Sequence, residues 1–187
     1  YPQWSRAIAK KTDTNQPIRV GFVSSCFWNH TVTKLFGGWI TEINRAHFSP
    51  YVFYTGKKKD KLTEQIQKHS VQFTSINTGI PHIAESIFQA ELDILIFLEI
   101  GMDPVLTQLA ALRLAPVQCA TWGHPVTTGL STIDYFLSSE LMEPGNGQSH
   151  YSERLVRLPN LSIHYHEPQL EPRSKTRTDF NLPTNKI

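Results

Sequence analysis

The chain has 187 residues, enough for one domain with a short extension but too short for a two-domain enzyme. Lysine and arginine number 18 against 16 acidic residues, a net charge of +2, and 40% of the residues are hydrophobic. This composition disfavours intrinsic disorder and a polyanion-binding basic protein, and it predicts a buried core. The basic clusters at residues 57–61 and 173–177 are interpreted as solvated surface, so no nucleic-acid partner is expected.

In chain order the predicted elements are a strand at 18–24, a helix at 35–45, a strand at 51–54, a helix at 59–69, a strand at 71–74, a helix at 81–89, a strand at 92–98, a helix at 105–112, and strands at 117–120, 133–137 and 155–158. Such alternation is typical of βαβ units around a mostly parallel sheet, so the fold class is α/β. The run at 92–98 is the most hydrophobic and predicts a central strand buried on both faces.

Composition changes at both ends of this pattern. Residues 1–17 are interpreted as a polar leader, residues 18–160 as the folded domain, and residues 161–187, rich in proline and charge, as a linker. No stretch approaches the roughly 18 to 20 apolar residues of a membrane span, and residues 1–11 lack the apolar centre of a signal peptide. We therefore expect a cytoplasmic protein without a membrane partner.

Polar residues follow the first strand, where a doubly wound sheet binds its ligands. The loop at residues 24–31 contains Asn29 and His30 in an aromatic setting, but neither a GxGxxG fingerprint nor a P-loop. His30 stands at the start of the next helix and is a candidate general base or donor to an anionic group. The alternative, at least as good from loop position alone, is that His30 caps or packs against the helix.

A second loop follows the strand at 117–120. It contains Trp122, Gly123, His124, Pro125, Thr127 and Thr128. Its hydroxyl and amide donors could line a polar substrate. From the sequence alone, an ordinary strand-exit loop punctuated by glycine and proline explains the same residues slightly better.

Carboxylates and histidines elsewhere suggest fewer roles. Glu99 ends the central strand without an obvious local task, whereas Asp103 beside Pro104 is best explained as a helix cap. Asp93 is interpreted as part of the strand rather than a catalyst. The pair His164 and His166 lacks a third ligand, and Cys26 and Cys119 lack disulfide or zinc spacing, so no metal is expected.

Five segments in this order resemble the catalytic region of the protein O-GlcNAc transferase and SPINDLY-like glycosyltransferase family. The segments are residues 18–25 with Asn29-His30, then 112–118, 122–129, 133–135 and 151–155. The resemblance covers about residues 18–160, and bacterial members, whose catalytic region follows tetratricopeptide repeats, look most similar. It implies a GT-B fold, in which two Rossmann-like domains enclose a nucleotide sugar and this chain is the first domain.

The resemblance further implies an inverting, metal-independent transfer of a sugar, expected to be N-acetylglucosamine, from a UDP-sugar to a serine or threonine of a protein. No cofactor is expected beyond the UDP-GlcNAc donor. A C-terminal UDP-sugar-binding domain would lie beyond the linker and tetratricopeptide repeats upstream, so the isolated fragment is expected to be inactive.

The resemblance also implies roles for individual residues. His30 matches the histidine of the family's Asn-His motif and is expected to be catalytic, and Glu99 is carried over by position only. Asn29 and the loop residues Trp122, Gly123, His124, Pro125, Thr127 and Thr128 are expected to bind substrate. The animal enzymes have Gly-Tyr-Pro where this chain has Gly123-His124-Pro125, a departure that bears on acceptor and sugar preference.

Two other classes remain open from the sequence. A Rossmann-like domain that binds or scaffolds without catalysis would have the same fold, because fold does not fix function. A nucleotide-binding sensor would bind its ligand through this chain alone. The Asn29-His30 pair and the loop at 123–129 favour the enzyme, because a scaffold does not need them.

Overall fold

A computed structural model describes residue 4 and residues 16–164 and 174–183 of the chain. Their elements are β1 (Ile18–Ser24), α1 (Thr31–Thr41), β2 (Phe48–Tyr54), α2 (Lys61–His69), β3 (Gln72–Ser75), α3 (Ile80–Gln89), β4 (Ile94–Phe97), α4 (Pro104–Ala110), β5 (Val117–Thr121), β6 (Tyr135–Ser139), η2 (Gly147–His150), β7 (Arg154–Leu158) and η3 (Arg177–Phe180). Every strand and helix predicted from the sequence is present, with shifts of a few residues at the ends.

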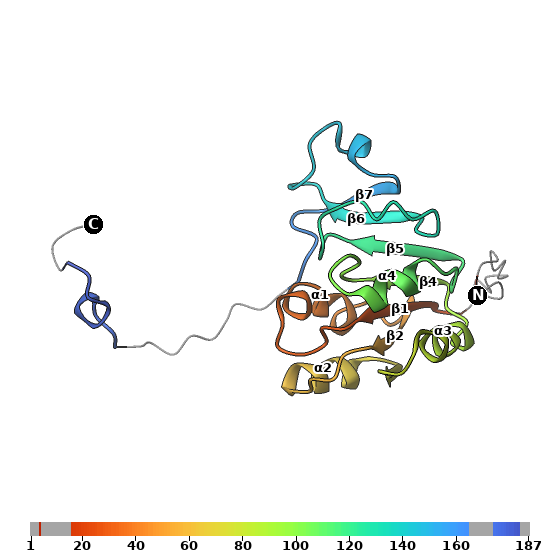
Figure 1. Ribbon diagram of the computed structural model, residues 1–187, viewed down its shortest axis with the longest axis horizontal. Helices are drawn as coiled ribbons and strands as arrows, with labels where there is room; N and C mark the ends of the chain where they lie inside the picture. The colour runs from red at the N-terminus through yellow and green to blue at the C-terminus, as the bar shows by residue number, and fades with distance from the viewer. Residues whose placement is uncertain (1–3, 5–15, 165–173, 184–187) are drawn as a thin grey trace.

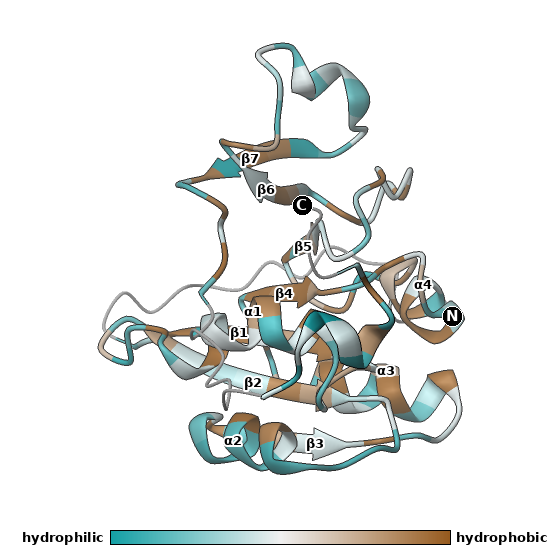
Figure 2. Ribbon diagram, turned by 90° about the vertical axis from the view of Figure 1, so that its left-hand side faces the viewer, coloured by the Kyte–Doolittle hydropathy of each residue, from teal (hydrophilic) through white to brown (hydrophobic). Residues whose placement is uncertain are grey.

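All seven strands form one sheet in the order β3-β2-β1-β4-β5-β6-β7 (Figure 1, Figure 2). Every pairing between neighbours in it is parallel. β4 occupies the centre, and Leu95 and Phe97 in it are fully buried while Ile96 is 7% exposed. The predicted α/β class, the mostly parallel sheet and the central strand buried on both faces are confirmed.

Two hydrophobic clusters, one on each face of the sheet, complete three layers. One packs α1 and α2 against the sheet through Phe36, Ile40 and Ile66. The other packs α3 and α4 through Ile83, Ile87, Leu106 and Leu109. Both faces of β1 are therefore covered, as a parallel strand requires.

The local sequence explains where several helices begin. Asp60 caps α2 by accepting hydrogen bonds from the N–H groups of Leu62 and Thr63. The Asp60 N–H in turn donates to the Thr63 hydroxyl oxygen, which completes a capping box. Asp103 caps α4 by accepting hydrogen bonds from the N–H groups of Val105 and Leu106, with Pro104 in the first turn, as the sequence predicts. α1 begins four residues before its predicted start because His30, an uncommon capping residue, occupies its N-cap.

Packing at both ends crosses the expected domain limits. Trp4, in the predicted leader, is 3% exposed in the α3–α4 cluster, and its carbonyl accepts a hydrogen bond from the Arg113 N–H. Ser162, in the predicted linker, is 8% exposed and receives the indole N–H of both Trp39 and Trp122. The rest of the leader and much of the linker lie outside the described residues. Within the described residues, no helix is long and apolar enough to cross a membrane.

Candidate functional site

The exits of β1, β4 and β5 lie side by side at the carboxyl edge of the sheet. The strand order reverses at this point: from β1 the chain proceeds to β2 and β3 on one side, and β4 then takes the other side. Such a switch point is where open α/β sheets form a ligand crevice. This strand order brings the loop with Asn29 and His30, the residue Glu99 and the loop at 121–130 to one edge of the sheet.

His30 sits at the N-cap of α1 with its ring half-buried. Its Nδ1 accepts the Val32 N–H at 3.2 Å, so the capping alternative raised by the sequence is correct. An accepting Nδ1 places the proton of the neutral ring on Nε2. No described residue forms a hydrogen bond with Nε2, so this N–H is available to an oxygen of a bound ligand. The cap and a role in the site are therefore compatible.

Asn29 is exposed beside His30, and its side-chain amide bonds to no described residue. Its backbone N–H donates to Asp60 Oδ2 at 2.6 Å. Desolvation opposes ionisation of Asp60, but the N–H groups of Asn29, Thr63 and Leu62 outweigh it and hold the pKa of this carboxyl below its ordinary value. Asp60 is not among the site residues expected from the sequence, although Asp-x-x-Thr before α2 is a recognisable capping pattern.

Glu99 has a clear local partner set, which corrects the expectation that it had none. Its Oε1 accepts the Ser24 hydroxyl at 2.9 Å, the Ser25 N–H at 2.6 Å and the Ser25 hydroxyl at 3.1 Å. The side chain is fully buried. Glu99 therefore ties the end of β4 to the exit of β1, a contact across 74 or 75 positions of sequence that no local pattern reveals.

Burial also changes the chemistry of Glu99. Desolvation raises its pKa to about 7, although the N–H of Ser25 and the hydroxyls of Ser24 and Ser25 act in the opposite direction. Its Oε2 is buried and has no hydrogen-bond partner among the described residues. The Glu99 carboxyl is fully buried and accepts hydrogen bonds from Ser24 and Ser25, so the geometry supports a positioning role for Glu99.

Trp122, Gly123 and His124 pack where β5 leaves the sheet. The Trp122 ring lies 5.0 Å from the Phe36 ring, so this indole belongs to the core as well as to the loop. A Cβ on Gly123 would meet the Leu98 carbonyl oxygen at 2.0 Å, so glycine allows the β4 and β5 exits to touch. His124 lies against Gly101, where φ is +95° and a Cβ would meet the imidazole at 2.5 Å. Of these three residues, only His124 has a titratable side chain, and it lies against the segment that follows β4.

Thr127 and Thr128, which are expected to bind substrate, form hydrogen bonds within the protein. Both hydroxyls donate to the carboxylate of Glu153, as does the Thr128 N–H at 2.7 Å. Glu153 is 2% exposed, and desolvation of this carboxylate is outweighed by these bonds, which lower its pKa. Of the remaining loop residues, Pro125 is exposed. This role of Glu153 is not visible in the sequence, because its partners lie 25 or 26 positions away.

The remaining ionisable residues considered from the sequence do not belong to this edge of the sheet. Asp93 accepts the Arg19 N–H at 2.8 Å at the opposite end of the strands, in agreement with a structural role. Among the described residues, no three His, Cys, Asp or Glu side chains are grouped to hold a metal ion. His164 is exposed, and His166 lies outside the described residues.

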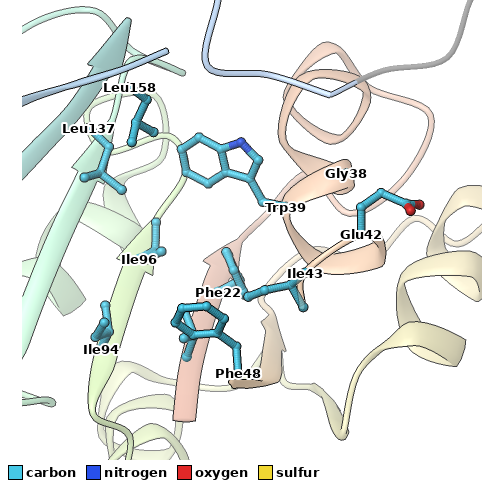
Figure 3. A pocket seen from close by; sticks show the side chains of 11 residues that line it. Phe22, Gly38, Trp39, Glu42, Ile43, Phe48, Ile94, Ile96, Leu137 and Leu158 are labelled. Atoms are coloured by element: carbon cyan, nitrogen blue, oxygen red, sulfur yellow. The ribbon is translucent and has the colours of Figure 1, made fainter. Parts of the chain in front are cut away.

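An apolar groove of about 410 Å³ opens on the α1 face of the sheet (Figure 3). Trp39 extends from α1 toward Leu137 and Leu158, and Ile94 and Ile96 form part of the lining. None of the predicted site residues lines this groove. Its one ionisable lining residue is Glu42, so the groove offers apolar surface and little chemistry.

The fold and the switch-point site define a Rossmann-like domain of the kind found in GT-B glycosyltransferases. Residues 3–176 match the family model of glycosyl transferase family 41. The chain therefore belongs to glycosyl transferase family 41, as the resemblance implied.

Relatives and a solved structure agree with this family. The chain is 30% identical over 178 residues to SEC of Arabidopsis thaliana and 28% identical over 170 residues to SPINDLY of the same plant. Both are described as probable UDP-N-acetylglucosamine–peptide N-acetylglucosaminyltransferases. These matches cover 91% and 88% of this chain but only 18% of each relative. A lysine-to-methionine mutant of the Thermobaculum terrenum O-GlcNAc transferase has the same fold, with a TM-score of 0.76 at 23% identity over 89% of this chain and 33% of that one.

Proposed function

We propose that this chain is the N-terminal catalytic half of a protein glycosyltransferase that moves N-acetylglucosamine from UDP-GlcNAc to a serine or threonine hydroxyl. Membership in the family supports the reaction class, and the position of His30 supports the assignment of the active site. Its Nε2–H is available at the switch point, while Nδ1 is fixed by the helix cap. The relatives named as N-acetylglucosaminyltransferases supply the donor and acceptor.

Transfer with inversion needs few groups. The acceptor oxygen attacks the anomeric carbon, the bond from that carbon to the diphosphate oxygen breaks, the hydroxyl proton leaves to a base, and UDP departs. A ring fixed with its proton on Nε2 donates a hydrogen bond and does not accept a proton at that atom. His30 therefore orients or stabilises an oxygen near the anomeric carbon, and the proton acceptor is another group.

The remainder of the catalytic machinery belongs to the same proposal. Residues 18–160 form the N-terminal catalytic domain, and residues 161–187 lead to a C-terminal domain that binds the UDP moiety. Tetratricopeptide repeats precede the domain, the protein acts in the cytoplasm, and the isolated chain is inactive. The span of only 18% of each plant relative supports further domains in the complete enzyme.

Substitution of His30 tests the site assignment. In the full-length protein that contains this sequence, His30→Ala should lower kcat/KM for peptide glycosylation by at least about tenfold, a loss of about 1.4 kcal/mol in transition-state stabilisation. His124→Ala should show a smaller loss, because its ring lies against Gly101 at the rim of the same edge. Activity of His30→Ala within about threefold of the wild type would reject the assignment.

Metal independence is part of this proposal and needs its own test. Transfer by the full-length protein should be unchanged after treatment with EDTA, because the diphosphate leaving group is stabilised by protein donors. UDP release with and without the chelator is the measurement. Loss of activity that returns with Mg²⁺ or Mn²⁺ would show that a metal ion takes part.

A further inference from the structure

The loop between β1 and α1 is fixed by side chains from outside itself. Besides Glu99, the Thr33 hydroxyl donates to the Cys26 carbonyl and the Thr63 hydroxyl donates to the Phe27 carbonyl, the latter at 2.6 Å. Thr63 is 2% exposed and belongs to α2, so one of these contacts comes from the neighbouring βα unit. The conformation that presents Asn29 and His30 is therefore not set by their own segment alone.

Asp60 makes the most direct contact with that end of the loop. Its Oδ1 accepts the N–H groups of Leu62 and Thr63 at 2.9 and 3.2 Å and caps α2. Its Oδ2 accepts the N–H of Asn29 at 2.6 Å, across 31 positions of sequence. Helix capping needs only one of the two carboxylate oxygens, so the second is used to hold the residue beside His30.

A second contact joins the same two loops. The Lys58 ammonium lies 3.9 Å from the centroid of the Trp28 ring, within the range of a cation–π interaction. The Trp28 ring in turn lies 5.1 Å from the His30 ring, tilted by 50°. Lys58 and Asp60 both precede α2, so one short segment contacts the two residues that come immediately before His30.

We propose that the segment between β2 and α2, through Asp60 and Lys58, is a positioning element that sets the place of Asn29 and His30 in the active site. This inference rests on the proposed function for its effect on catalysis, but the contact itself is independent of it. Asp60 and Lys58 act through Asn29 and His30 and are positioning residues. Their loss shifts the His30 ring without removing any group that touches the substrates.

The substitution Asp60→Ser separates this role from folding. Serine caps helices as well as aspartate does, so α2 is retained, but its short hydroxyl does not reach Asn29 while it caps. Hydrogen exchange measured by mass spectrometry in the full-length protein should show faster exchange in the peptide that contains Asn29 and unchanged exchange in α2. The matched control is Asp103→Ser at the cap of α4, which should leave exchange at Asn29 unchanged. Unchanged exchange at Asn29 in Asp60→Ser overturns the proposal, whatever the activity.

A mutant cycle with Asn29 and His30 tests the effect on catalysis. Asp60→Ser should lower kcat/KM by about tenfold in the wild type but by less than about twofold in an Asn29→Ala/His30→Ala background, because a residue that acts through these two side chains has no effect without them. Equal losses in both backgrounds would mean a merely structural effect and overturn the proposal. If the wild type transfers no sugar, the proposed function fails, while the exchange measurement still decides whether Asp60 holds the loop.

Discussion

At the scale of single residues, Glu99 links the stability of the site to pH. Its carboxyl is fully buried, and burial raises its pKa from 4.5 to about 7. A carboxyl with a raised pKa in the folded state stabilises that state while it is neutral. The contribution is complete below pH 4.5 and is lost as the pH rises toward about 7. The difference between these two pKa values corresponds to at most roughly 3 kcal/mol of unfolding free energy.

The variant Glu99→Gln should remove this pH dependence, because glutamine stays neutral at every pH. Between pH 5 and pH 8, the thermal midpoint of the wild type should fall more than that of Glu99→Gln. Scanning calorimetry at several pH values measures the effect, and Glu85→Gln on the exposed side of α3 serves as the control. Parallel pH profiles for the wild type and Glu99→Gln would show that Glu99 does not ionise over this range.

At the scale of elements, the loop after β5 is shaped by a partner from the segment before β7. Glu153 receives the hydroxyls of Thr127 and Thr128 and the Thr128 N–H, so three donors from one loop converge on one buried carboxylate. Removal of a donor to a buried charged group costs about 1 to 3 kcal/mol. These threonines therefore stabilise the loop that carries His124.

Thr128→Val tests that assignment. We expect a loss of about 1 to 3 kcal/mol in unfolding free energy, since the valine leaves one Glu153 oxygen with fewer donors. Chemical denaturation provides the measurement, with Thr78→Val, an exposed position, as the control. Unchanged stability together with a raised KM for the acceptor would instead assign Thr128 to substrate binding.

Element positions follow from local sequence, whereas their exact ends depend on neighbours. The run at 92–98 predicts β4 because all of its residues except Asp93 are apolar, as in a strand covered on both faces. The start of β2 at Phe48 escapes prediction because Pro50 lacks an N–H and normally marks an edge or the end of a strand. In this sheet β3 pairs with β2 only from Tyr51 onward, so Pro50 lies where β2 has one strand neighbour.

At the scale of the whole molecule, the contacts that build the site depend on strand order. Glu99 meets Ser24 and Ser25 because β4 lies beside β1, an adjacency that sequence periodicity does not specify. The hydrogen bond between Asp60 and Asn29 likewise depends on β2 lying beside β1. The sequence could therefore predict the α/β class and the loops that carry the site, and the resemblance supplied His30. It could not predict which carboxylates hold those loops in place.

The proposed function requires that the complete protein transfers N-acetylglucosamine to a protein hydroxyl. The direct measurement incubates the full-length protein with UDP-GlcNAc and a serine-containing acceptor peptide, and it quantifies UDP release together with the mass of the peptide. We expect equal amounts of UDP and glycosylated peptide. A folded protein that releases no UDP and leaves the peptide unmodified would contradict it and would point to a binding or scaffolding domain that retains the fold without the reaction.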